Sequence, residues 1–430
     1  MTRARLSVGL VSPLPPVRSG IADYAKELVV PLREHVDLTT FAPAQAARAV
    51  ESSCDVLLFQ VGNDPLHLPS VEALRERRKP AVVVLHDFVL HHLFAAGYLD
   101  HGHLDRYERE LVRCHGLDGG ELAAKARSGA AVPVWDLSPW TFPMSAGVIA
   151  DATALLVHSR LVRGAVLRAR PACHVVEIPH HVVPAPVTPC DEARRRLGIP
   201  RDRPVAVTLG IVTPAKRVSK VLEALAAVPE ASRPFLVVGG AVGTEDPLHA
   251  QVESLGLAAD VLFTGYLSDD DFWVAASAAD LAVNLRHPTM GETSGAVCRL
   301  AGFGLPVVVS DVGWFRELPD AFAIKVPVGD GEVELLARTL ASLGDPVWKR
   351  RSEAARAWGL ERSPERVAAR YSEVLHDVAG GRSGERELTA FLASQLSALG
   401  VGAGGRSPSR GPDGALLAGV AALAAPLLRA

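Results

Sequence analysis

Long uninterrupted apolar runs are missing from this sequence of 430 residues. No stretch reaches the roughly 18 apolar residues that a membrane-spanning helix needs. The apolar run near the N-terminus breaks at Pro13, so it is too short for the core of a signal peptide. We therefore expect neither a spanning helix nor a cleaved leader, while association with a membrane surface stays open.

An excess of either charge is also missing, because 45 Lys and Arg side chains are balanced by 48 Asp and Glu, a formal net charge of −3. Without a sustained basic stripe, a nucleic-acid binder is not expected. The five cysteines are scattered and form no C-x-x-C pair, which argues against a zinc site or a disulfide framework. Reduced thiols of this kind are typical of a cytoplasmic protein.

What the chain does contain is a repeated alternation of short apolar runs with helical patterns, in both halves. Such alternation predicts two α/β domains, each a doubly wound parallel sheet of the Rossmann-like kind, facing each other across a cleft. The expected strands are 6–12, 36–41, 55–61, 80–85, 154–159, 175–179, 205–209, 235–238, 261–263, 281–285, 307–310 and 323–326.

A Pro-rich run at 184–189 has no periodicity and is the best domain linker. Ser363 followed by Pro364 suits a helix start, and an apolar stripe follows at helical spacing. Beyond 380 the composition changes to Gly, Ser, Pro and Ala. The predicted organisation is an N-terminal Rossmann-like domain at 1–185, a C-terminal Rossmann-like domain at 190–362, a helix returning to the first domain at 363–380, and a flexible tail at 381–430.

The stretch 284–318 reads as strand, polar turn, helix and strand, which is a βαβ unit. The turn at 291–295 should place free backbone N–H groups at a helix N-terminus, where an anion is favoured. A carboxylate in that turn would repel a phosphate. Glu292 is therefore better suited to hydroxyl groups or to a developing positive charge.

Two cations, Lys216 and Arg217, follow a strand that ends in Gly210. Lys216 is a compact charge suited to a diphosphate, and Arg217 could bind the same group or pair elsewhere. A surface Lys-Arg pair is the plainer alternative. The first strand leads to a Pro/Gly loop with Gly20 at a helix entrance, but the G-x-G-x-x-G of dinucleotide-binding dehydrogenases is absent there.

His86 and Asp87 follow the strand 80–85, and open α/β sheets place their sites at such strand ends. His86 could orient an acceptor hydroxyl or face a sugar, with Asp87 near it, although a lone His is more often structural. His91 and His92 are expected to be solvated or to cap a helix. The region 99–143 looks irregular and could wall an acceptor cleft or be a packed surface excursion.

Several of these motifs together resemble the retaining glycosyltransferases of family 4 (glycosyl transferases group 1), which have the GT-B fold. The resemblance covers about 6–380. It depends on the order and spacing of S-G-I-A-D-Y, L-H-D, V-H-S-R, G-I-V-T-P-A-K-R, F-T-G-Y and R-H-P-T-M-G-E-T-S-G followed by G-L-P-V-V-V-S-D-V-G-W-F-R-E-L.

The resemblance implies transfer of a sugar from a nucleotide-diphosphate sugar, with retention, to a glycan, lipid-linked or small-molecule acceptor. The donor would bind mainly to the C-terminal domain, and the acceptor to the N-terminal domain. It implies no cofactor and no metal ion, since cations and helix N-termini would stabilise the leaving group. The implied catalytic residues are His86, Lys216 and Glu292, and Asp87 would bind the acceptor. The implied donor contacts are Gly20, Gly210, Lys216, Arg217, Tyr266, Glu292, Thr293, Ser294, Gly295 and Arg299.

The chain departs from the family pattern in two places. The second motif glutamate, expected eight positions after Glu292, is Leu300, and Arg299 before it could meet a phosphate or an acidic neighbour. The arginine often found five positions before the lysine is Ile211, and Arg217 could compensate. The lost second glutamate allows a non-catalytic sugar-nucleotide-binding protein as an alternative. A sugar-nucleotide epimerase is a further alternative on the same architecture. A cytoplasmic location is expected, with polysaccharide biosynthesis at the inner membrane face as one setting.

Overall fold

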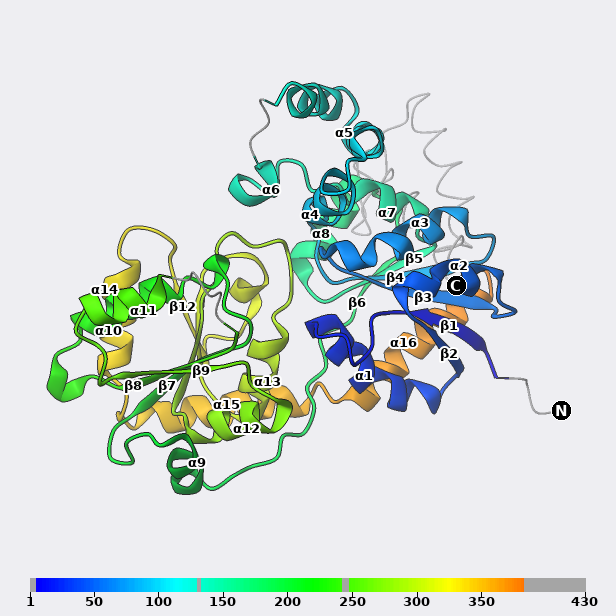
Figure 1. The fold of residues 1–430 in the computed structure, drawn as a ribbon. Coiled ribbons are helices and arrows are strands. Elements are labelled where there is room, and N and C mark those ends of the chain that lie inside the picture. The colour runs from blue at the N-terminus through cyan, green and yellow to red at the C-terminus, as the bar shows by residue number, and fades with distance from the viewer. Residues whose placement is uncertain (1–4, 130–132, 242–246, 383–430) are drawn as a thin grey trace, which may run out of the picture.

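The computed structural model describes residues 5–129, 133–241 and 247–382 and contains two parallel β-sheets with helices on both faces (Figure 1). The predicted strands are all present, within two residues of their predicted ends. The predicted fold class, two doubly wound α/β units, is therefore confirmed. The tail predicted at 381–430 lies outside the described residues, apart from Gly381 and Arg382.

The first sheet has the strand order β2-β1-β3-β4-β5-β6, and every pairing in it is parallel. Its strands are β1 (Ser7–Val11), β2 (Asp37–Phe41), β3 (Val56–Val61), β4 (Ala81–Leu85), β5 (Ala154–Val157) and β6 (Val175–Glu177). The helices of this half are α1 (Gly20–Arg33), α2 (Ala46–Glu51), α3 (Leu68–Glu76), α4 (His91–Phe94), α5 (Leu104–Arg127), α6 (Val134–Leu137), α7 (Ala146–Asp151) and α8 (Arg160–Ala169).

The second sheet has the order β12-β11-β10-β7-β8-β9 and is also parallel throughout. Its strands are β7 (Val205–Leu209), β8 (Phe235–Gly239), β9 (Val261–Gly265), β10 (Leu281–Asn284), β11 (Val307–Ser310) and β12 (Ala323–Val326). The later helices are α9 (Cys190–Leu197), α10 (Val218–Ala227), α11 (Leu248–Ser254), α12 (Asp269–Ala278), α13 (Gly295–Phe303), α14 (Glu332–Ala341), α15 (Val347–Leu360) and α16 (Pro364–Ala379).

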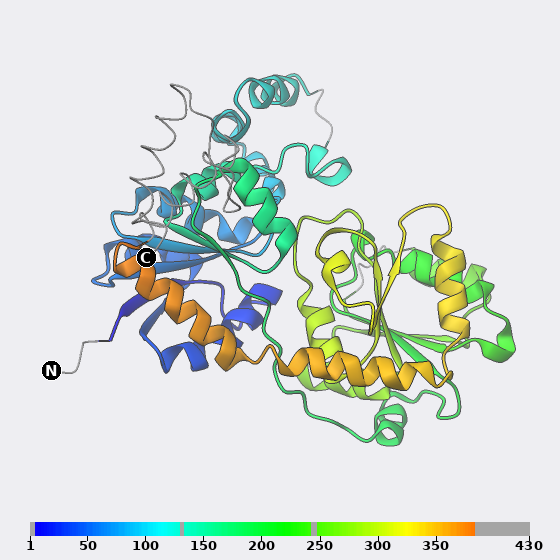
Figure 2. The ribbon, with the colours of Figure 1, turned by 180° about the vertical axis from the view of Figure 1, so that it is seen from behind.

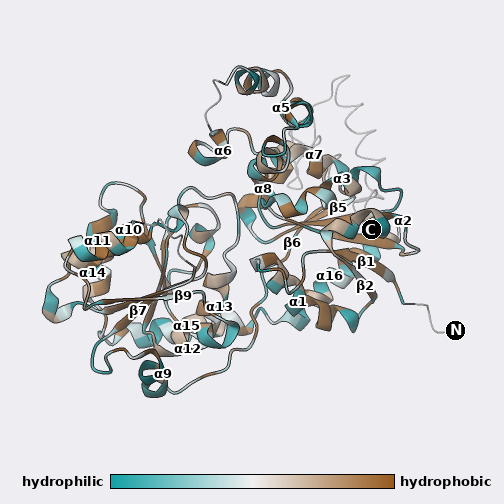
Figure 3. Cartoon of the chain, in the orientation of Figure 1, coloured by the Kyte–Doolittle hydropathy of each residue, from teal (hydrophilic) through white to brown (hydrophobic). Residues whose placement is uncertain are grey.

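Central strands such as β3, β4 and β7 are buried along their whole length because helices cover both faces. Figure 3 shows them as hydrophobic ribbons inside more polar helices. In the second sheet β7 and β10 are neighbours although β8 and β9 come between them in the sequence, so the order of the strands reverses there. Open α/β sheets bind ligands at this point, outside the carboxyl ends of the strands.

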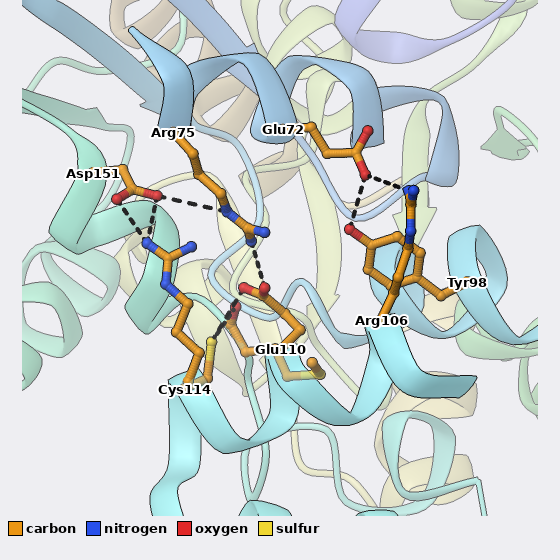
Figure 4. Close-up of polar contacts among 9 residues, drawn as sticks. Glu72, Arg75, Tyr98, Arg106, Glu110, Cys114 and Asp151 are labelled. Carbon is orange, nitrogen blue, oxygen red and sulfur yellow. Dashed lines mark hydrogen bonds and ion pairs between the residues drawn. The ribbon is translucent and has the colours of Figure 1, made fainter. Parts of the chain in front are cut away.

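The region 99–143 is more regular than its sequence predicts, because α5 occupies most of it and is kinked at Gly116, where φ is 57° and ψ is −130°. Figure 4 shows how α5 is tied to the domain beneath it. Arg75 on α3 lies 2.5 Å from the buried Glu110 carboxylate, and Arg106 lies 3.3 Å from Glu72. Helix α5 is thus a fixed part of the first domain.

His91 also corrects the prediction, since it is fully buried and not solvated. Its Nδ1 lies 2.7 Å from the Phe142 carbonyl oxygen and its Nε2 lies 2.6 Å from the Tyr107 hydroxyl. Burial lowers the pKa of His91 to about 4, so the ring is neutral. His91 therefore joins α4 to α5 and to the segment before α7, while His92 is exposed as expected.

The last described helix, α16, returns to the first domain after α15 has packed along the second (Figure 2). Val367, Tyr371 and Val378 on α16 are buried in the same core as residues of β1, β3 and β4. The Tyr371 hydroxyl lies 2.7 Å from that of Tyr24 on α1. Within the described residues, no helix combines the length and apolar character required to cross a bilayer.

Candidate active site

Lys216 lies at the reversal point of the second sheet, in the short turn Pro214–Lys216 that follows β7. Its side chain is 7% exposed, and its Nζ donates to the Leu209 carbonyl oxygen at 3.1 Å. Burial, with the charge of Arg286, lowers the pKa of Lys216 to about 7. The ammonium group is therefore poorly compensated in the protein alone, as expected of a group that binds an anion.

The N-terminus of α13 lies next to this lysine. Gly210 has a φ of 102°, and a Cβ built on it would lie 2.7 Å from Lys216 Nζ and 3.9 Å from Ala296 Cβ. Ser294 caps the helix, because its hydroxyl accepts from the Val297 N–H at 3.3 Å. The first N–H groups of a helix have no acceptor within it, so this end can add to the binding of an anion at Lys216.

Glu292 is held by its own turn. Its Oε2 accepts hydrogen bonds from the Met290 N–H at 2.6 Å and from the Thr289 hydroxyl at 2.9 Å. Its Oε1 lies 3.0 Å from Arg286 Nε. Although the two charges are paired, the buried Arg286 Nε–H forms no hydrogen bond within the described residues. The Glu292 carboxylate is therefore fixed in position, while Arg286 keeps an N–H that could donate to another anion.

Asp87 lies on the other domain and faces Glu292. Its Oδ2 accepts from the Asn63 N–H at 2.8 Å. Burial and the nearby charge of Glu292 raise the pKa of Asp87 to about 7. The two loops are joined by backbone hydrogen bonds, since the Phe88 and Val89 N–H groups both donate to the Met290 carbonyl oxygen at 2.9 Å. The domains therefore meet where two carboxylates approach each other.

His86 lies in a cluster of aromatic and imidazole rings, and its Nε2 lies 2.5 Å from Gln60 Oε1. Its ring centroid is 5.0 Å from that of Tyr24 and 5.1 Å from that of His158. Burial and the neighbouring histidines lower the pKa of His86 well below its ordinary value, so the ring is neutral. A neutral imidazole here can donate or accept a hydrogen bond, but it does not supply a positive charge.

Gly20 and Tyr266 lie at another part of the interface between the two domains. Gly20 is exposed at the first position of α1, and a Cβ added there would meet nothing within 4 Å. Tyr266 is 56% exposed, and the Arg18 guanidinium lies 4.5 Å from its ring centroid. Arg18 was not predicted as a site residue. The loop before Gly20 thus reaches the rim on which Tyr266 lies.

Two predicted donor contacts, Arg217 and Arg299, have guanidinium groups that are paired with carboxylates in this structure. Arg217 binds both oxygens of the buried Glu332. Arg299 lies 3.0 Å from Glu27 on α1 and 3.2 Å from Asp269 on α12. Of the alternatives open for Arg299, the structure shows the acidic neighbour, and its pair with Glu27 joins the two domains.

Arg286 is the residue that the sequence reasoning missed. It belongs to the R-H-P-T-M-G-E motif, but its spacing from Lys216 gave no sign that the two lie together. The His287 N–H donates to the Ala215 carbonyl oxygen at 2.8 Å, which ties the residue after Arg286 to the residue before Lys216. The Arg286 N–H donates to the Ser310 hydroxyl at 2.9 Å.

A separate cavity of 230 Å³ lies between the domains, and its lining contains none of Lys216, Asp87 or Glu292. Glu317 lines it and accepts from the Arg160 and Leu161 N–H groups at 3.0 and 2.7 Å, so a carboxylate of the second domain caps α8 of the first. Across the parts of the chain that the structure describes, no group of three or more His, Cys, Asp or Glu side chains could hold a metal ion.

Comparison with known proteins agrees with this geometry. Residues 190–356 match the family model described as Glycosyl transferases group 1, so the second half carries a domain of that kind. The chain is also similar to an uncharacterized glycosyltransferase of Methanocaldococcus jannaschii, with 29% identity over 126 residues. That match covers 29% of this chain and 32% of the relative, so it spans about a third of the relative's length.

Solved structures show where the whole fold belongs. The chain is similar to sucrose-phosphate synthase from Thermosynechococcus elongatus, with a TM-score of 0.63 and 16% identity over 88% of this chain and 100% of the other. It is similar to Anabaena HepE in complex with UDP-glucose, with a TM-score of 0.61 and 16% identity over 86% of this chain and 100% of the other. The two-sheet architecture is therefore the GT-B fold of glycosyltransferases.

Proposed function

We propose that the protein is a retaining glycosyltransferase of family 4 that transfers a sugar from a nucleotide-diphosphate sugar to an acceptor without a metal ion. The observation that carries this proposal is the buried Lys216 beside the N-terminus of α13, at the sheet position where α/β domains bind ligands. The group 1 domain at 190–356 and the HepE complex with UDP-glucose support a nucleotide-sugar donor.

In this proposal each group acts on a different part of the reaction. The bond from the anomeric carbon to the diphosphate breaks, a bond forms from that carbon to the acceptor oxygen, and the acceptor proton passes to the departing phosphate. Lys216 and the α13 N–H groups stabilise the charge that develops on this phosphate. Glu292 binds hydroxyls of the donor sugar. Asp87 accepts a hydrogen bond from the acceptor hydroxyl, for which a carboxyl with a pKa of about 7 is suited. His86 adds a neutral hydrogen-bonding contact to the sugar.

The test begins with thermal unfolding in the presence of a panel of nucleotide sugars, since a donor that binds the native state raises the melting temperature. The donor found in this way is then used to measure nucleotide release with glycan and lipid-linked acceptors. Lys216→Ala should lower turnover about 100- to 1,000-fold, as for loss of one preorganised charge. Lys220→Ala is the matched control, because Lys220 is a partly exposed lysine of α10 that pairs with Glu223.

Wild-type turnover in Lys216→Ala would contradict the proposal. So would binding of a nucleotide sugar without transfer to any acceptor, which would indicate a binding protein. Conversion of the nucleotide sugar in the absence of an acceptor would indicate an epimerase.

A further inference from the structure

The family position that usually supplies a second cation to the diphosphate is Ile211 in this chain, and Ile211 is 59% exposed. Arg217, the nearest replacement in sequence, is occupied by Glu332, which is 2% exposed. A group that neutralises a diphosphate must therefore come from elsewhere in the fold. Arg286 is the cation that the structure places beside Lys216.

Three observations place Arg286 there. The His287–Ala215 hydrogen bond fixes its loop against the turn that carries Lys216. The side chain is 19% exposed, and its buried Nε–H has no acceptor among the described residues. Its charge also lowers the pKa of Lys216, which requires the two cations to be close. Two neighbouring cations, one of them with an Nε–H that is in an ion pair but not hydrogen-bonded, are suited to a diphosphate.

We infer that Arg286 is the second diphosphate-binding cation of this protein, and that the donor splits the Arg286–Glu292 ion pair. Arg286 then binds the diphosphate, while Glu292 binds hydroxyls of the sugar. After transfer, loss of the sugar leaves Glu292 free to pair with Arg286 again, which weakens the hold on the nucleoside diphosphate. This inference rests on the proposed donor site at Lys216.

The inference makes a prediction of opposite sign for the two members of the pair. Arg286→Gln should weaken binding of a nucleoside diphosphate about 10- to 100-fold, the range for loss of a charged hydrogen bond. Glu292→Gln should strengthen binding of the same nucleoside diphosphate about 3- to 10-fold, because Arg286 no longer has a competing carboxylate. Arg286→Lys should keep part of the affinity, since it keeps the charge but not the planar fork.

Calorimetric titration with UDP, GDP, ADP and dTDP, and with inorganic pyrophosphate, measures these affinities in the full chain. Arg316→Gln is the matched control, because Arg316 forms an exposed ion pair with Asp311 on a neighbouring loop. The double variant Arg286→Gln/Glu292→Gln separates two causes of tighter binding. If Glu292 acts through Arg286, the gain disappears in the double variant.

A gain that persists in the double variant would show simple repulsion by Glu292 and would overturn the exchange of partners. Unchanged affinity in Arg286→Gln, together with weakened binding in Lys216→Ala, would overturn the role of Arg286 alone. A loss in Arg217→Gln as large as that in Arg286→Gln would also overturn it. Unchanged affinity in Lys216→Ala would remove the donor site itself, and with it the proposed function.

Discussion

Lys216 should make the folded protein less stable than an apolar residue would, and this cost should depend on pH. Burial lowers the pKa of its ammonium from 10.5 to about 7, and each pKa unit corresponds to about 1.4 kcal/mol. The cost is fully present below pH 7, where both folded and unfolded chains carry the proton, and it is at most about 4 to 5 kcal/mol. It disappears as the pH rises from about 7 to 10.5, because the folded lysine loses its charge first.

Lys216→Met removes this charge with little change in volume. It also removes the hydrogen bond to Leu209, which contributes about 1 kcal/mol. We therefore expect the variant to be more stable by about 3 kcal/mol near pH 6.5, and by clearly less near pH 9.5. Urea unfolding followed by tryptophan fluorescence gives the free energy of unfolding of variant and wild type at both pH values. Subtracting one from the other at each pH removes the contribution of all other titrating groups.

The reasoning would be refuted by a variant that is no more stable than the wild type near pH 6.5. It would equally be refuted by a stability difference that stays constant between the two pH values. The variant should in addition lose nucleoside diphosphate binding, so that a gain in stability accompanies a loss of function.

Two further predictions concern the contact between the domains. Gly291→Ala places a methyl group at a φ of 83° and 2.8 Å from Phe88 Cβ, so we expect a loss of about 1 to 3 kcal/mol and lower turnover; an unchanged melting temperature in calorimetry would contradict this. Asp87 has a pKa raised to about 7, so turnover that needs its carboxylate should fall as the pH drops below 7. In Asp87→Asn the profile of kcat/KM against pH should lose this step, and an unaltered profile would exclude Asp87 as the titrating group.

The strands could be predicted because each is a continuous apolar run that a parallel sheet buries on both faces. Helix α5 could not, because Gly116, Gly119 and Gly120 interrupt its pattern and its anchors are ion pairs to α3 and α7. Those partners lie about 35 residues away in the sequence, and nothing in the local pattern identifies them.

The site shows the same division. The positions of Lys216, Glu292 and Asp87 beyond strand ends could be predicted, because parallel strands bring their carboxyl ends to one edge. The ion-pair partners of two arginines could not be predicted, since Arg217 pairs with a glutamate 115 positions away and Arg299 with one 272 positions away. The place of Arg286 beside Lys216 was not predicted either, because it depends on a backbone hydrogen bond between two loops that are far apart in the sequence. Their proposed roles remain predictions for the experiments above.

The return of α16 has a consequence for how the chain is made. The first sheet is complete once β6 has been synthesised, yet the core beneath it needs Val367, Tyr371 and Leu375. About 190 residues lie between β6 and α16, which is roughly 10 to 40 s of synthesis on a ribosome. During that time the second domain, whose strands and covering helices are contiguous, can fold first. The N-terminal domain is therefore the one that finishes last, and its apolar face is the surface that a chaperone would protect.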